Sequence, residues 1–142
     1  MLRVVIDTNL LVSALLTHQG NPAKILDLFQ KEQIEIVISR QILEEMKRVL
    51  GYPKIQRRHE WTSQEISRFL EELEQLCIVV DPPRREVPIL QNDPSDDKYL
   101  DCAVVGEVDY VITGDKDLLE LGEYKGVRIV RPTQFLELME LA

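Results

Sequence analysis

The sequence predicts an α/β fold in which helices cover both faces of a central parallel sheet of about five strands. Three observations support this prediction. Short runs rich in valine and isoleucine alternate along the chain with longer segments of helical periodicity. These runs are mostly apolar, as expected of parallel strands that are buried on both faces. Residues that start and stop helices separate the two kinds of segment, which is typical of repeated strand–helix units.

In the first half of the chain, helix boundaries are marked by proline, serine and glycine. Pro22 suits an early helical position. Ser39 is expected to cap a helix that Gly51 and Pro53 end. The segments expected here are, in chain order, a strand at 2–6, a helix at 10–16, a helix at about 22–31, a strand at 34–38 and a helix at 40–50.

The second half repeats the alternation. Thr62 and Glu65 form a capping-box pattern, Ser95 is expected to cap a later helix, and Pro132 opens the terminal one. The expected segments are a helix at about 62–76, a strand at 77–80, a helix at about 96–106, strands at 110–113 and 127–130, and a helix from 132. No repeat or linker interrupts the pattern, so residues 1–142 are expected to form one domain.

Composition and charge argue against a membrane-spanning protein, a secreted protein and a nonspecific nucleic-acid-binding protein. Hydrophobic residues make up 44% and charged residues 30% of the 142 residues, which is typical of a globular protein. No apolar run approaches the roughly 20 residues that span a bilayer, and the start of the chain has no signal-peptide pattern. Cys77 and Cys102 form no CxxC pair and are expected to be buried thiols of a cytoplasmic protein. A net charge of −8 argues against broad nonspecific binding to nucleic acid.

Four acidic residues lie where strands end or where helices face strand ends. Ligands of open α/β sheets bind outside the carboxyl ends of the strands, where the strand order reverses. If the strands before Asp7 and Asp115 are neighbours at that reversal, their carboxylates share one crevice. Gathered carboxylates repel one another, and divalent cations with oxygen ligands relieve that repulsion. The set of four is Asp7, Glu45, Asp96 and Asp115.

Helical geometry selects among neighbouring acids. Glu44 lies nearly opposite the apolar stripe of its helix, whereas Glu45 lies at the edge of the stripe and is the better candidate. Asp96 is in line with the buried side of the later helix, at four and seven residues from Leu100 and Ala103. Asp97 flanks that side and remains a candidate second ligand, although acids in a first turn also serve simply as caps.

Polar neighbours fit a supporting role. Thr8 and Asn9 offer a hydroxyl and an amide that can orient Asp7, and Thr113 can do the same for Asp115. Asp117 either assists the site or caps the short helix that follows. Together these residues indicate metal-assisted phosphodiester hydrolysis with Mg²⁺ or Mn²⁺.

Four segments carry a resemblance to a known family. They are VVIDTNLLVSALL, ISRQILEEMKRVL, DPSDDKYLDCAVV and DYVITGDKDLLEL. The chain resembles PIN-domain proteins, and more narrowly the VapC-like toxin components of type II toxin–antitoxin systems. The resemblance extends over nearly the whole chain.

The resemblance implies a three-layer α/β/α sandwich and a metal-dependent ribonuclease. The family's acidic quartet falls on Asp7, Glu45, Asp96 and Asp115, and its supporting polar positions fall on Asn9 and Thr113. It also implies an RNA substrate, an antitoxin partner that blocks the acidic crevice, and dimer contacts through the early helices. The alternative is a PIN-like protein that binds RNA or a partner protein with little or no turnover.

Overall fold

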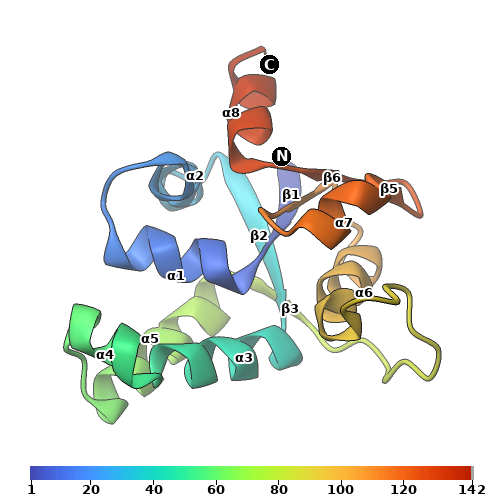
Figure 1. The fold of residues 1–142 in the computed structure, drawn as a ribbon. Helices are drawn as coiled ribbons and strands as arrows, with labels where there is room; N and C mark the ends of the chain where they lie inside the picture. The colour runs from blue at the N-terminus through green and yellow to red at the C-terminus, as the bar shows by residue number, and fades with distance from the viewer. Residues whose placement is uncertain (142) are drawn as a thin grey trace.

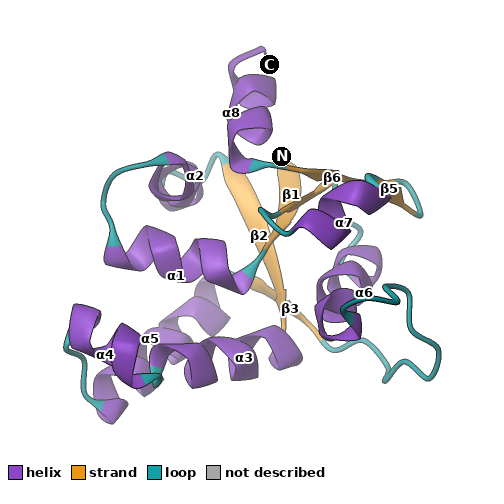
Figure 2. Cartoon of the chain, viewed as in Figure 1, coloured by secondary structure: helices purple, strands orange, loops and turns teal. Residues whose placement is uncertain are grey.

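A computed structural model describes residues 1–141 of the chain, and its main elements alternate between helix and strand (Figures 1 and 2). The strands are β1 (Leu2–Ile6), β2 (Ile34–Ser39), β3 (Ile78–Val80), β4 (Tyr110–Ile112), β5 (Glu123–Tyr124) and β6 (Val127–Val130). The helices are α1 (Thr8–Leu16), α2 (Asn21–Gln30), α3 (Arg40–Leu50), α4 (Pro53–His59), α5 (Ser63–Leu76), α6 (Asp97–Val105), α7 (Lys116–Leu121) and α8 (Pro132–Leu141). A 3₁₀ turn, η1, covers Pro94–Asp96.

The strands form one sheet in the order β3-β2-β1-β4-β6-β5, which is parallel except for the β5–β6 pair. From β1 the chain builds β2 and β3 on one side and then crosses to β4 on the other. The strand order therefore reverses between β1 and β4, where Ile6 is in register with Ile112. The expectation that these two strands are neighbours is confirmed, and the residues after both strands lie at the same edge of the sheet.

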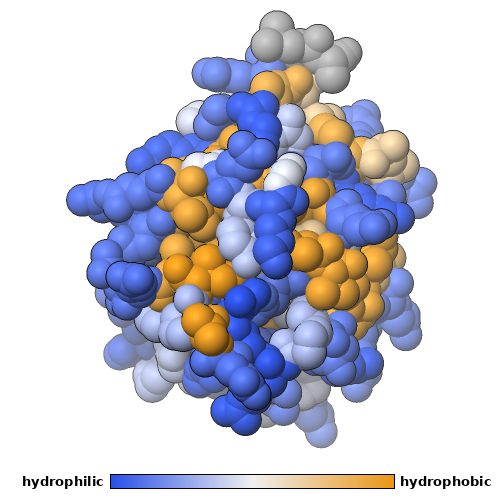
Figure 3. All heavy atoms as spheres, turned by 90° about the vertical axis from the view of Figure 1, so that its right-hand side faces the viewer, coloured by the Kyte–Doolittle hydropathy of each residue, from blue (hydrophilic) through white to orange (hydrophobic). Residues whose placement is uncertain are grey.

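Helices cover both faces of the sheet, as the α/β/α prediction requires. Figure 1 shows α1 and α2 on one side and α6 and α7 on the other. The strands between them are apolar because both faces are covered, and Val4 and Val5 are fully buried. On the outer face that carries α6 and α7, apolar patches are separated by hydrophilic side chains (Figure 3). No helix within residues 1–141 is long and apolar enough to cross a membrane.

The sheet has six strands within the described residues rather than about five. The additional strand, β5, has two residues and pairs antiparallel with β6. Lys125 and Gly126 both have positive φ in the tight turn that joins these strands. A two-residue strand has no periodicity of its own, so the sequence pattern could not indicate it.

Helix α4 was not predicted. Pro53 was expected only to end the preceding helix, but it also occupies the first turn of α4, where its missing N–H is no loss. Smaller corrections concern helix starts: α1 begins at Thr8, because Asp7 caps it. Ser95 does not cap α6: Asp96 is the N-cap residue and makes no side-chain capping bond, while Asp93 caps the preceding η1 turn by accepting the Ser95 amide at 3.3 Å.

Candidate active site

A threonine joins two of the four acids at the reversal point. Asp7 follows β1 and caps α1, with its Oδ1 accepting the Asn9 amide at 3.0 Å. Thr113 follows β4, and its hydroxyl donates to Asp7 Oδ2 at 2.8 Å while accepting the Asp115 amide at 3.0 Å. Asp115 in turn caps α7 by accepting the Leu118 amide at 3.0 Å. Each carboxylate is thus fixed by the helix that it caps, and one buried hydroxyl contacts the Asp7 carboxylate and the Asp115 backbone amide.

Glu45 projects from α3 toward this unit. Its side chain is 17% exposed, whereas Glu44 faces solvent, as the helical geometry predicted. Lys98 contacts Glu45 Oε2 at 2.6 Å, and the Tyr99 hydroxyl donates to Oε1. Burial alone raises the pKa of Glu45, but the hydrogen bond from Lys98 and further donors outweigh it, so the pKa is lowered. Glu45 is therefore held as a carboxylate.

Asp96 ends the η1 turn and lies half-buried beside the other acids. Burial, together with the charges of Asp93, Asp115 and Asp7, raises the pKa of Asp96 to about 7. The pKa of Asp7 is also raised, first by burial and then by the charges of Glu45 and Asp115, despite the bonds from Thr113 and Asn9. These mutual effects are those of carboxylates that share one region of low solvation.

The raised pKa of Asp96 predicts a pH-dependent stability. Between its ordinary value of 3.8 and about 7, the folded chain holds a proton that the unfolded chain releases, so the Asp96 contribution falls as pH rises through this window. We expect metal-free Asp96→Asn to be more stable than wild type by about 1–2 kcal/mol at pH 8, after allowance for solvent screening, and equal to it near pH 4. Urea unfolding in chelator measures this difference. An equal difference in the free energy of unfolding between the variant and the wild type at both pH values would contradict the prediction.

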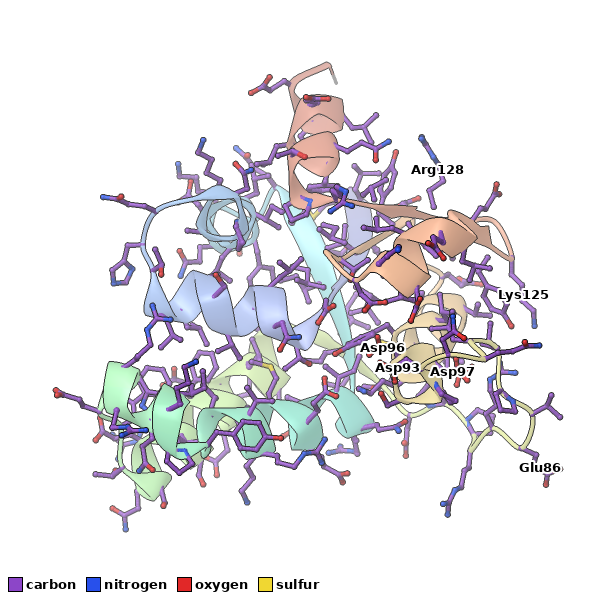
Figure 4. All side chains as sticks on the ribbon, in the orientation of Figure 1. Glu86, Asp93, Asp96, Asp97, Lys125 and Arg128 are labelled. Atoms are coloured by element: carbon purple, nitrogen blue, oxygen red, sulfur yellow. The ribbon has the colours of Figure 1, made fainter. Side chains whose placement is uncertain are left out.

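Asp97, a candidate second metal ligand in the sequence, accepts hydrogen bonds from two backbone amides of a loop. It is buried, and its two carboxylate oxygens accept the backbone amides of Ile89 and Leu90, both at 2.9 Å. Those amides belong to the long loop at 81–93, drawn in teal in Figure 2. Figure 4 shows Asp93, Asp96 and Asp97 together at the start of α6, whereas Glu86 lies at the outer end of the loop. The Asp97 carboxylate therefore ties the loop to α6, which gives this buried acid a structural role.

The remaining supporting residues differ in burial. Thr8 is 1% exposed, its amide donates to the Tyr99 hydroxyl at 3.3 Å, and its own hydroxyl has no hydrogen-bond partner within residues 1–141. Asn9 is exposed and contributes its backbone amide to Asp7. Asp117 lies in the first turn of α7, which fits the capping role that the sequence left open.

Sequence reasoning did not identify Lys98 and Tyr99. Lys98 is 6% exposed and Tyr99 2%, and both contact Glu45, which is far away in the chain. A lysine is rarely buried unless it is paired. Its acidic partner is on α3, so no local pattern could reveal the pair.

The donor set fits a hard divalent cation. The carboxylates supply only oxygen ligands, and the pKa values of Asp7 and Asp96 are raised first by burial and then by repulsion from neighbouring acids, both of which a bound cation relieves. Within the described residues no group of three or more histidine, cysteine or acidic side chains is already closed around an ion position. The acids are nevertheless near enough for the charges of Asp7, Asp96 and Asp115 to act on one another.

Comparison with known proteins identifies the family. The PIN domain family model matches residues 3–117, which include all four acids. The chain belongs to the PIN domain family. PIN domains are in general nucleases that use divalent metal ions. Uncharacterized protein MJ1680 of Methanocaldococcus jannaschii is 30% identical to this PIN-domain chain. The match covers 98% of this chain and 92% of MJ1680.

Two solved structures share the PIN fold. PAE2754 from Pyrobaculum aerophilum has a TM-score of 0.57 at 16% identity, covering 99% of this chain and 91% of its own. VapBC2 from Rickettsia felis was solved bound to a DNA fragment from its promoter. It has a TM-score of 0.58 at 14% identity, and the match covers 92% of this chain and 98% of the VapBC2 chain. At such low identities the likeness concerns the fold alone, and it agrees with the predicted VapC-like α/β/α architecture.

Proposed function

We propose that this PIN-domain chain is a divalent-metal-dependent ribonuclease whose catalytic quartet is Asp7, Glu45, Asp96 and Asp115. The observation that carries the proposal is the Thr113 hydroxyl, which donates to the Asp7 carboxylate and accepts the Asp115 backbone amide where β1 and β4 end. Asp96, with its pKa raised to about 7 by burial and by neighbouring acids, faces the same region. Membership of a nuclease family supports this assignment.

In this proposal Asp7, Asp96 and Asp115 would hold Mg²⁺ or Mn²⁺, which would supply an activated water and stabilise charge on the scissile phosphate. The chain's own residues prepare the site. Thr113 and the Asn9 amide each take one Asp7 oxygen and so fix the direction of its remaining lone pairs. Lys98 and Tyr99 hold Glu45 at the rim of the crevice, where it can orient a water beside the phosphate.

The biological setting is proposed from the VapC-like resemblance. VapBC2 from Rickettsia felis is a structural neighbour, and by analogy we propose that this chain is the toxin of a cytoplasmic toxin–antitoxin pair. Residues 1–142 would then form one nuclease domain, with an antitoxin covering the crevice. Half-buried leucines on α1 offer apolar area for a homodimer.

The second candidate function is an RNA- or partner-binding protein with little turnover. One observation favours it: both Glu45 oxygens are already engaged, by Lys98 and by Tyr99. A side chain held in this way can be structural. Comparing Glu45 with its exposed neighbour distinguishes the two functions.

We expect the wild type to cleave members of a panel of single-stranded, structured and transfer RNAs with Mg²⁺ or Mn²⁺, and to lose this activity in chelator. Glu45→Gln should slow cleavage by about a hundredfold, because it removes the charge at the crevice. Glu44→Gln is the matched control on the exposed side of the same helix and should cleave like the wild type. Gel analysis of end-labelled RNA measures all three. RNA binding without cleavage by any of them would favour the second candidate.

A further inference from the structure

Lys98 is an almost fully buried lysine that lies against one of the four candidate acids. Only 6% of its surface is exposed, and its ammonium group contacts Glu45 at 2.6 Å. The same group donates to the carbonyl of Ser95, which immediately precedes Asp96. It also lies 4.9 Å from the centre of the Tyr99 ring. A buried charge with this many partners is positioned by the fold.

These contacts join the three segments that carry Asp7, Glu45 and Asp96. Lys98 connects α3, through Glu45, with the η1 turn, through the Ser95 carbonyl. Tyr99 extends the connection to the start of α1, because its hydroxyl donates to Glu45 and accepts the Thr8 amide. Burial and the adjacent Asp7 and Glu45 charges raise the pKa of Tyr99, which keeps the phenol protonated as the donor.

We propose that Lys98 is a positioning residue that acts as a fixed cation of the active site. Its ammonium pairs with the Glu45 carboxylate, which would otherwise be free to bind a second divalent ion. The site therefore binds one ion, at Asp7, Asp96 and Asp115, and Glu45 is held for the reaction by Lys98 and Tyr99 rather than by metal. The inference rests on the proposed nuclease function and specifies how that site is charged.

The substitution Lys98→Met keeps a side chain of similar length and removes its charge. The proposal predicts that it raises the affinity for Mn²⁺ and lowers the rate of RNA cleavage. Mn²⁺ should bind about tenfold more tightly, or a second ion should bind, because the crevice gains one negative charge and Glu45 becomes free. RNA cleavage at saturating Mn²⁺ should fall by about 10- to 100-fold, because Glu45 loses its fixed position. Damage to the fold would weaken binding and cleavage together.

Isothermal titration of each purified full-length chain with Mn²⁺ alone gives the affinity and the number of ions bound. Removing one partner of a buried ion pair can impair folding, so the double variant Lys98→Met/Glu45→Gln is measured beside the single one. The double variant removes both charges and should return to the affinity of the wild type. Lys31→Met is the matched control, because Lys31 is an exposed lysine whose ion pair with Asp27 lies on α2.

The outcomes separate this inference from the proposed function. Tighter or additional Mn²⁺ binding with slower cleavage by Lys98→Met, reversed in affinity by the double variant, supports it. A wild type that binds two ions would overturn it, as would a folded Lys98→Met that binds Mn²⁺ with unchanged or lower affinity. If Lys98→Met does not fold, a double variant that departs from wild-type affinity overturns it. A wild type that neither binds Mn²⁺ nor cleaves RNA overturns the proposed function as well.

Discussion

Asp7→Asn is expected to reduce metal-dependent RNA cleavage by about a thousandfold without destabilising the metal-free protein. The amide keeps the shape of the carboxylate. Its oxygen can accept the Asn9 amide, and the Thr113 hydroxyl can rotate to accept from its nitrogen. The substitution removes only the charge that a cation needs. Because burial and neighbouring acids raise the pKa of Asp7, loss of that charge should keep or increase stability.

Two measurements on the same preparation check this prediction. Single-turnover cleavage with Mn²⁺ gives the rate, and thermal unfolding in chelator gives the stability. Cleavage at an undiminished rate would assign the wild-type activity to a contaminant. A lower melting temperature together with lost cleavage would show that Asp7 is needed for folding and would leave its catalytic assignment unsupported.

Asp97→Ala is expected to destabilise the protein by about 3 kcal/mol, because two buried backbone amides lose a charged acceptor. The loss should be present in chelator, since it arises from the attachment of the loop at 81–93 to α6. Denaturant unfolding measures it. Asp97→Asn should lie between wild type and Asp97→Ala, because an amide offers only one acceptor oxygen to the two donors.

Glu86→Ala is the matched control for this loop. Glu86 is an exposed acid at the outer end of the loop, and its removal should change the free energy of unfolding by no more than about 0.5 kcal/mol (Figure 4). If Asp97 were instead a metal ligand, Asp97→Ala would retain its stability in chelator and lose Mn²⁺ affinity. That result would restore the role that the sequence pattern suggested.

The sequence was sufficient for the element types because their signals are local. Valine and isoleucine runs indicated β1, β2, β4 and β6, and the Thr62–Glu65 capping box indicated the start of α5. The helical positions of Glu44 and Glu45 predicted which of them faces solvent, and the exposure of each side chain agrees. The local pattern did not predict α4, because one residue both ends a helical pattern and begins the next helix. Pro53 ends one helical pattern and also starts α4.

The sequence by itself therefore determined the alternating elements and the four acids at their ends, since each depends on residues within a turn or two. Only the tertiary structure decided what those acids contact. The pairing of β1 with β4 lets the Thr113 hydroxyl reach Asp7, and the packing of α6 against the sheet buries Lys98 beside Glu45. Such contacts join residues far apart in the chain, and they form because burying the apolar faces of the helices fixes where each polar side chain must find a partner.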